Sequence, residues 1–139
     1  MSYGLPPIVK LAEALMRDLE LAVSRFPRRF RYTVGAQLTQ DAFNVATAAH
    51  RAWRAPTDSL EGLSEAIDRL KLRMQLAQQI HAFASFAQFE ALARAAANLG
   101  KQCGGWAKRM SKRQNGETQV STQRPQILSS RSASSEAST

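Results

Sequence analysis

The stretch RFPRRFRYTVGAQL, residues 25–38, decides where the chain leaves its first helix and enters its second. Pro27 has no backbone N–H and restricts the residue before it, so a helix that reaches this point must end. Four arginines and three aromatic residues crowd around this proline, and an amphipathic segment follows from about Arg31. The stretch therefore predicts an interhelix turn with a high concentration of positive charge.

Apolar residues recur periodically on both sides of this turn. Their steps of three, four and seven place them on one face of a helix. The segments with this spacing run over about 7–25, 31–53, 58–81 and 85–112. No segment shows the alternation of a half-buried strand. The sequence predicts an all-α fold, an antiparallel up-down-up-down four-helix bundle over residues 1–112, with short connections.

The ends of these helices carry recognisable signals. Pro56 should end the second helix because its ring cannot continue it. The pairs Asp58–Glu61 and Ser85–Gln88 have the spacing of a capping box, in which each side chain bonds the backbone N–H of the other residue. We therefore expect the third helix to open at Asp58 and the fourth after Ser85.

Residues 113–139 depart from the helical pattern. Ten of these 27 residues are serine or threonine, and Ile127 with Leu128 is their only apolar pair. Such a segment buries too little apolar surface to offset the entropy lost on ordering. We expect a disordered C-terminal tail.

Length and composition bound the class of protein. The chain has 139 residues, enough for one domain, and its apolar share of 44% is normal for a globular protein. No apolar run approaches the roughly 18 residues of a membrane-spanning helix, and no signal-peptide pattern opens the chain. One cysteine, Cys103, excludes a disulfide within the chain. We expect a soluble cytoplasmic protein with no membrane partner.

The charge balance points to an anionic partner. Lysine and arginine number 19 against 11 acidic residues, which gives a net charge of +8. Nucleic acid, a membrane surface and an acidic protein would all match such an excess. Because arginine dominates and its planar fork binds phosphate bidentately, the composition favours phosphate.

The fourth predicted helix concentrates basic residues on one side. At about 100° per residue, four of them lie within a few tens of degrees of one another. These four are Arg94, Lys101, Lys108 and Lys112. Arg109 extends this basic stripe, and no acidic residue follows Glu90 until Glu117. Solvation of a surface helix also explains a polar stripe, but solubility is usually served by charges of both signs.

Two other basic groups are candidates for phosphate contact. The turn after the first helix carries one, and Arg51 with Arg54 forms the other near the end of the second helix, where the helix dipole alone would account for them. The aromatic residues of the turn could stack on unpaired bases. Burial at the end of the bundle is favoured for them, because Phe26 continues the apolar face of the first helix. The full candidate nucleic-acid-binding set is Arg28, Arg29, Arg31, Arg51, Arg54, Arg94, Lys101, Lys108, Arg109 and Lys112.

The residue types that catalysis needs are scarce. His50 and His81 are the only histidines, and neither lies in a HExxH, CxxC or paired-carboxylate context. Nothing in the sequence brings His50 to Cys103, and a buried thiol is common. No phosphate-cradling glycine motif occurs. We predict a protein that is not an enzyme and that needs no metal or cofactor.

Two stretches resemble one family of small four-helix-bundle proteins. FPRRFRYTVGAQL, residues 26–38, resembles the entry to the second helix in these proteins, and LGKQCGGWAKRMSK, residues 99–112, resembles the glycine-basic-tryptophan ending of one branch. That branch is the accessory variability determinant (Avd) proteins of diversity-generating retroelements. The other branch contains proteins encoded in intervening sequences of ribosomal RNA genes. The likeness spans roughly residues 10–113.

The second helix separates the two branches. Intervening-sequence proteins usually carry an acidic N-x-A-E-G there, whereas this chain has NVATAAHRA, residues 44–52, with Arg51 and no glutamate. The Avd branch is therefore favoured. That resemblance implies a homopentamer that binds nucleic acid (template RNA and cDNA) and a reverse transcriptase through basic surfaces, and so supports mutagenic cDNA synthesis. The alternatives are a basic helical adaptor for an acidic protein and an intervening-sequence protein of structural role.

Overall fold

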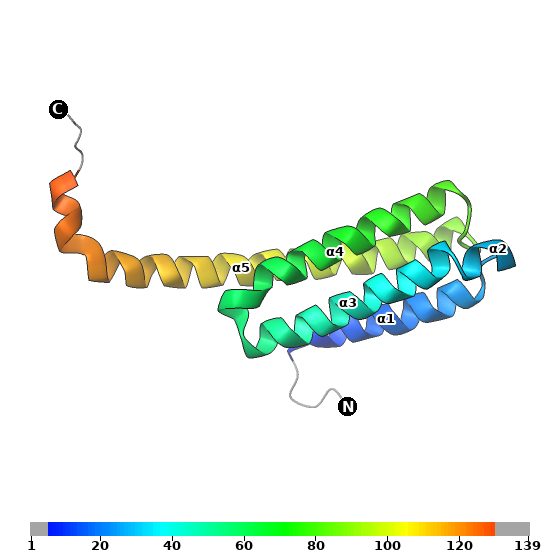
Figure 1. The fold of residues 1–139 in the computed structure, drawn as a ribbon, viewed down its shortest axis with the longest axis horizontal. Coiled ribbons are helices and arrows are strands. Elements are labelled where there is room, and N and C mark those ends of the chain that lie inside the picture. Colours follow the sequence, from blue (N-terminus) through cyan, green and yellow to red (C-terminus); the bar gives the residue numbers. More distant parts are fainter. Residues whose placement is uncertain (1–5, 130–139) are drawn as a thin grey trace. The chain divides into compact units, whose positions relative to one another are not determined.

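The computed structural model describes the backbone of residues 6–129 and the side chains of residues 6–56 and 59–113. Within that range the chain forms five helices and no strand. They are α1 (Pro7–Ser24), α2 (Arg28–Arg31), α3 (Val34–Arg54), α4 (Pro56–Gln79) and α5 (Phe86–Ser129) (Figure 1). Four of them are long, and α2 is a single turn. The predicted all-α bundle is thus confirmed.

The chain divides after Ala107 into two compact units. The first unit holds α1 to α4 and the beginning of α5, and it forms the bundle. The second begins at Lys108 and holds the rest of α5, which runs on to Ser129 instead of ending near Lys112 as predicted. The arginine, glutamine and glutamate residues between Arg113 and Gln119 are good helix formers, and no proline interrupts the chain before Pro125. Residues 130–139 of the predicted tail lie outside the described residues.

Helices α1 and α3 run antiparallel. Glu13, in the first half of α1, bonds His50, near the end of α3, at 2.7 Å. Val23, at the end of α1, lies against Gly35 at the start of α3. A Cβ on Gly35 would come 2.8 Å from Val23 Cγ1 and 3.0 Å from the Phe30 carbonyl oxygen, so glycine is what lets the two chain segments approach.

Helices α3 and α4 are joined by an ion pair. Arg73 Nε donates to Asp41 Oδ2 at 2.8 Å, and Arg73 Nη1 donates to Gln37 Oε1 at 3.0 Å. Asp41 is 5% exposed, and a carboxylate so buried is costly unless a donor satisfies it. The guanidinium of Arg73 is that donor and fixes the register of the two helices.

Helices α4 and α5 are also antiparallel. The Cys103 thiol lies 3.9 Å from the Leu60 carbonyl oxygen at the start of α4. Gly100, earlier in α5, faces Ile67, which lies two turns further along α4. Together with the other two pairs, this gives the predicted up-down-up-down arrangement for the first unit.

Leucines from every long helix form the core of the bundle. Leu19, Leu38, Leu63, Leu70 and Leu99 are all fully buried. They occupy the periodic positions that define the apolar faces in the sequence. Burial of each such side chain contributes about 1.5–3 kcal/mol to folding, so these faces hold the helices together.

Helix α2 lies in the connection between α1 and α3. Phe30 N–H donates to the Pro27 carbonyl oxygen at 2.9 Å, and Thr33 N–H donates to the Phe30 carbonyl oxygen at 3.3 Å. Because these bonds close a separate helical turn, α3 begins at Val34 rather than near Arg31 as predicted. Figure 1 shows α2 at the same end of the bundle as the α4–α5 connection. Phe26 is buried there, edge-on to Phe83 with ring centroids 5.1 Å apart, which confirms its predicted burial.

The capping box expected at Ser85 is present, whereas the side chain of Asp58 lies outside the described residues. Ser85 Oγ accepts the Gln88 N–H at 3.1 Å, while Gln88 Oε1 accepts the Ala84 N–H at 3.3 Å, one residue before the usual partner. The prediction at Asp58 is wrong, because α4 begins two residues earlier at Pro56. Proline suits a first helical position, where no backbone N–H needs a partner.

Helix α4 ends in a left-handed residue. His81 has φ 61°, its N–H donates to the Gln78 carbonyl oxygen at 3.0 Å, and Ala82 N–H donates to the Ala77 carbonyl oxygen at 2.9 Å. This pair of bonds is a Schellman motif, with histidine where glycine is usual. Ala77 and Ala82 are both fully buried, which supplies the apolar contact that accompanies the motif.

Candidate nucleic-acid interface

The arginines at α2 differ in what they touch. Arg28 and Arg29 are exposed, and the guanidinium of Arg29 lies over the Phe30 ring, 4.5 Å from its centroid. Arg31 is half-buried. Its Nη2 donates to the Phe26 carbonyl oxygen at 3.3 Å, and its Nε is buried with no partner among the described atoms. Arg31 therefore braces the turn, and Arg28 and Arg29 present their charge to solvent.

The aromatic residues of the same turn also differ in how far they are buried. Phe26 is in the core, Phe30 is half-buried beneath Arg29, and Tyr32 is 72% exposed. The prediction that these rings pack into the bundle end holds for Phe26 and fails for Tyr32. Tyr32 follows the last residue of α2, where its side chain faces away from the core.

Arg51 and Arg54 lie in the last turn of α3, and both are exposed. A helix of 21 residues is about 30 Å long, so these arginines stand about that distance from the α2 turn at the other end of α3. Their charge also complements the negative end of the α3 dipole. The structure thus separates two basic groups that the sequence could not place.

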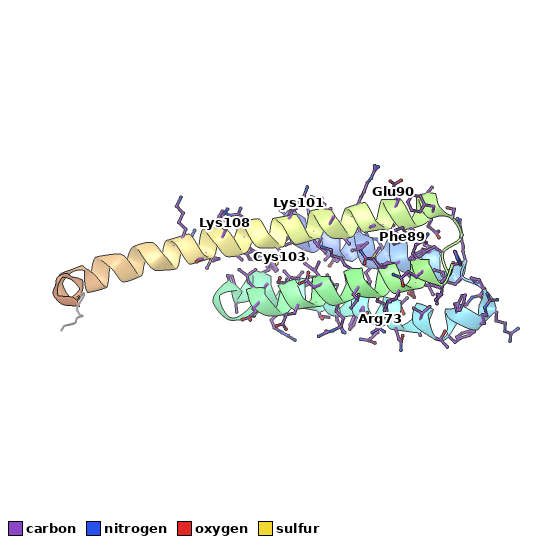
Figure 2. All side chains as sticks on the ribbon, turned by 90° about the horizontal axis from the view of Figure 1, so that it is seen from above. Arg73, Phe89, Glu90, Lys101, Cys103 and Lys108 are labelled. Carbon is purple, nitrogen blue, oxygen red and sulfur yellow. The ribbon has the colours of Figure 1, made fainter. Side chains whose placement is uncertain are left out.

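Arg94 and Lys101 belong to the part of α5 in the first unit, and both are exposed. Arg94 Nη2 pairs with Glu90 Oε2 at 3.4 Å, with side chains 79% and 49% exposed. An exposed pair of this kind contributes little to stability and leaves the cation accessible. In Figure 2, Lys101 and Glu90 lie along the outer edge of α5, while Phe89 and Cys103 lie on its side toward α4.

Lys108, Arg109 and Lys112 belong to the second unit. All three are exposed on α5. The predicted basic stripe is therefore shared between the two units, with two of its four residues in each. Within its own unit each group is a short run of cations on one helix.

A basic residue outside the predicted set lies between α4 and α5. Lys71 is half-buried and lines a hollow of about 320 Å³ together with Lys101 and Asp68. The sequence carried a usable signal for Lys71, because it stands four residues after the core residue Ile67 and so borders the buried face. Grouping basic residues only within the fourth helix missed it.

The surroundings of Cys103 and His50 give neither side chain the setting of a reactive group. Burial, and then the negative charge of Asp68, raise the pKa of the Cys103 thiol. The thiol therefore stays protonated and is a poor nucleophile. His50 is bonded to Glu13 across α1 and α3. Among the described residues, no group of histidine, cysteine, aspartate and glutamate side chains has the geometry of a metal site.

Residues 6–129 contain no helix with both the length and the apolarity needed to cross a lipid bilayer. Comparisons with protein-family models, curated proteins and solved structures found no match to this chain. The likeness to Avd proteins therefore rests on the stretches around Gly35 and Trp106 alone.

Proposed function

We propose that this chain is an Avd-like accessory protein of a diversity-generating retroelement, which binds nucleic acid and the reverse transcriptase and supports mutagenic cDNA synthesis. The observation that carries the proposal is the accessibility of its cations. Nine of the ten predicted contact residues are exposed, Arg31 being the exception. Among the described side chains, only Arg94 of the ten has a carboxylate within 4.0 Å.

Such a protein would bind by electrostatics. Each phosphate neutralised by lysine or arginine releases condensed counterions, so affinity is highest at low salt. The described side chains form no array suited to reading base edges, so contacts to phosphate would position the strand without selecting a sequence. Assembly into a homopentamer, which the resemblance implies, would repeat each basic group around a ring and raise avidity.

Salt-dependent binding tests the proposal. The full chain should bind single-stranded RNA in fluorescence anisotropy, with an affinity that falls steeply between 50 and 200 mM salt, as is typical of multiple phosphate contacts (about 300-fold for six contacts to a single strand). Reversing two charges in Arg28→Glu/Arg29→Glu should reduce the slope of log affinity against log salt by about 1.4, because each lost contact to a single strand removes about 0.7.

A matched control is available on α1. Lys10→Glu/Arg17→Glu makes the same change in net charge at two exposed residues outside the predicted set. Equal weakening by both double variants would reduce the interaction to net charge alone. Absence of any RNA affinity at 150 mM salt would overturn the proposal.

A second candidate function is an adaptor that docks another protein. The observation that favours it is the four-residue spacing of Leu72 and Leu76 on α4 and of Ile80 directly after it, which are 59%, 47% and 45% exposed. Residues at this spacing share one helical face and can seat a partner helix. This candidate predicts negligible RNA affinity at 150 mM salt, and Leu72→Ser/Leu76→Ser should then abolish capture of the protein partner.

A further inference from the structure

The seam between α4 and α5 is hollowed along its length. One hollow, of about 190 Å³, is mostly apolar and is bordered by Met74, Phe89 and Ala93. The next and larger hollow, of about 320 Å³, is lined by polar and apolar groups alike and carries the cation of Lys101. The two hollows share Lys71 and Ala97, so they adjoin along the groove. An apolar recess beside a cationic one is the arrangement that an amphipathic ligand requires.

Phe89 gives the apolar hollow a rigid flat wall. Its ring centroid lies 5.5 Å from that of Phe83 and 5.9 Å from that of Phe86. These two contacts limit the rotation of the ring, so a planar ligand would meet a preformed surface. Aromatic rings in such settings stack on nucleobases irrespective of base identity.

Small residues on α5, Ala97 and Gly100, border the larger hollow. A Cβ at Gly100 would stand 3.8 Å from both Lys71 Nζ and Ile67 Cγ2, which shows how near the Lys71 ammonium comes to the helix backbone. Lys101 stands at the outer edge of the same hollow, and the side chain of Asp68 also lines it. Two cations and one carboxylate leave a single net positive charge.

That charge balance selects among anionic ligands. A phosphodiester in a nucleic-acid strand carries one negative charge and matches the hollow. A free nucleotide with several phosphate charges would meet repulsion from Asp68. A base can enter the apolar hollow only if it is unstacked and unpaired, which is the normal state of a single strand.

We propose that the α4–α5 seam binds one nucleotide unit of a single-stranded nucleic acid, with the base in the apolar hollow against Phe89 and the phosphodiester between Lys71 and Lys101. This site rests on the proposed nucleic-acid function and adds base stacking to its electrostatics. It also assigns a role to Lys71, which belongs to none of the basic groups at the helix ends.

Ala97→Leu tests the base contact without changing charge. Ala97 is exposed and borders both hollows, so a leucine there should fill their junction. Binding of the full chain to an RNA oligoadenylate of about 12 nucleotides should weaken about fivefold or more, the effect of losing one stacked base. Binding to an abasic ribose-phosphate chain of equal length should not change. Ala91→Leu, at an exposed residue of α5 that lines neither hollow, is the matched control.

Lys71→Gln tests the phosphate contact independently. It should lower the salt slope by about 0.7, whereas Arg69→Gln, an exposed residue of the same helix that lines neither hollow, should leave the slope within error. Binding of adenosine monophosphate tests whether the site takes a free nucleotide instead of a strand. Adenosine monophosphate should bind at least tenfold more weakly than the oligomer. A difference of less than tenfold would overturn the assignment of the site to a strand.

The outcomes separate this inference from the function on which it rests. If the chain binds RNA but Ala97→Leu and Lys71→Gln leave binding unchanged, the seam site is wrong and the proposed function stands. If oligoadenylate and the abasic chain bind equally to the unaltered protein, no base is held and the seam site is also wrong. If the unaltered protein binds no RNA, both proposals fail. Circular dichroism of each variant should show the same helix content.

Discussion

The α1–α3 seam and the α4–α5 seam use glycine for opposite purposes. At Gly35 a Cβ would lie 2.8 Å from Val23 Cγ1, closer than carbon atoms pack, so glycine closes the first seam. At Gly100 a Cβ would meet nothing closer than 3.8 Å, so glycine leaves the second seam open. The same residue type thus marks tight packing in one seam and unfilled space in the other, and only the neighbouring helix distinguishes the two.

The two seams also differ in how their charged groups are paired. In the α1–α3 seam, Glu13 and His50 bond each other at 2.7 Å. In the α4–α5 seam, Lys71 has no carboxylate within 4.0 Å among the described side chains, although Asp68 lines the same hollow. A seam closed by its own contacts serves stability, whereas one with an unpaired cation beside open space is suited to a ligand.

The largest effect is expected at the tight seam. Gly35→Ala should destabilise the protein by about 1–2 kcal/mol, because overpacking costs about 1–3 kcal/mol and the gain in helix propensity returns at most about 1. Urea unfolding followed by circular dichroism would measure the change. Gly62→Ala is the control, since a Cβ there meets nothing within 4 Å. Equal stability of the two variants would refute the close approach at Gly35.

A smaller effect is expected further along the same seam, toward the end of α3. Glu13→Ala should cost about 1 kcal/mol, because it removes the carboxylate that bonds the half-buried His50 ring. Glu13→Gln should recover part of that loss, since an amide oxygen can still accept from the ring N–H. Both variants are compared with the unaltered protein by their urea midpoints. A loss in Glu13→Gln as large as in Glu13→Ala would show that charge, and not the hydrogen bond, matters there.

The smallest effect, with the opposite sign, is expected at the open seam. Gly100→Ala should stabilise the protein by up to about 1 kcal/mol, because alanine favours the helix and its methyl group meets only ordinary contacts. The gain should match that of Gly62→Ala within error. A loss of stability at Gly100 would mean that the α4–α5 seam closes as tightly as the α1–α3 seam.

Periodicity was sufficient to predict the four long helices, since each periodic segment contributes buried leucines to the core. Local chemistry placed the start of α5, where Ser85 and Gln88 bond backbone N–H groups. It misplaced the start of α4, because proline at a first helical position outweighed the Asp58 signal. Helix α2 escaped prediction, since one turn is too short to show a period.

The candidate site was less accessible to sequence reasoning. Basic character could be read from single residues, and exposure of Arg28 and Arg29 followed from their place in a turn. The inward bond of Arg31 and the pairing of Lys71 with Lys101 around one hollow depend on residues distant in the chain, so neither could be read from spacing along one helix. Both contacts depend on which helices pack together, and the periodicity of a single helix does not encode that pairing.

The bond from Arg31 to the Phe26 carbonyl oxygen also affects how α2 would meet a polyanion. It anchors the turn to the end of α1, so the backbone beneath Arg28 and Arg29 is ordered before any encounter. Association then restricts only the rotamers of two side chains, which lowers the entropic penalty relative to a flexible basic loop. Rigidity of this corner is thus a source of affinity that a count of charges leaves out.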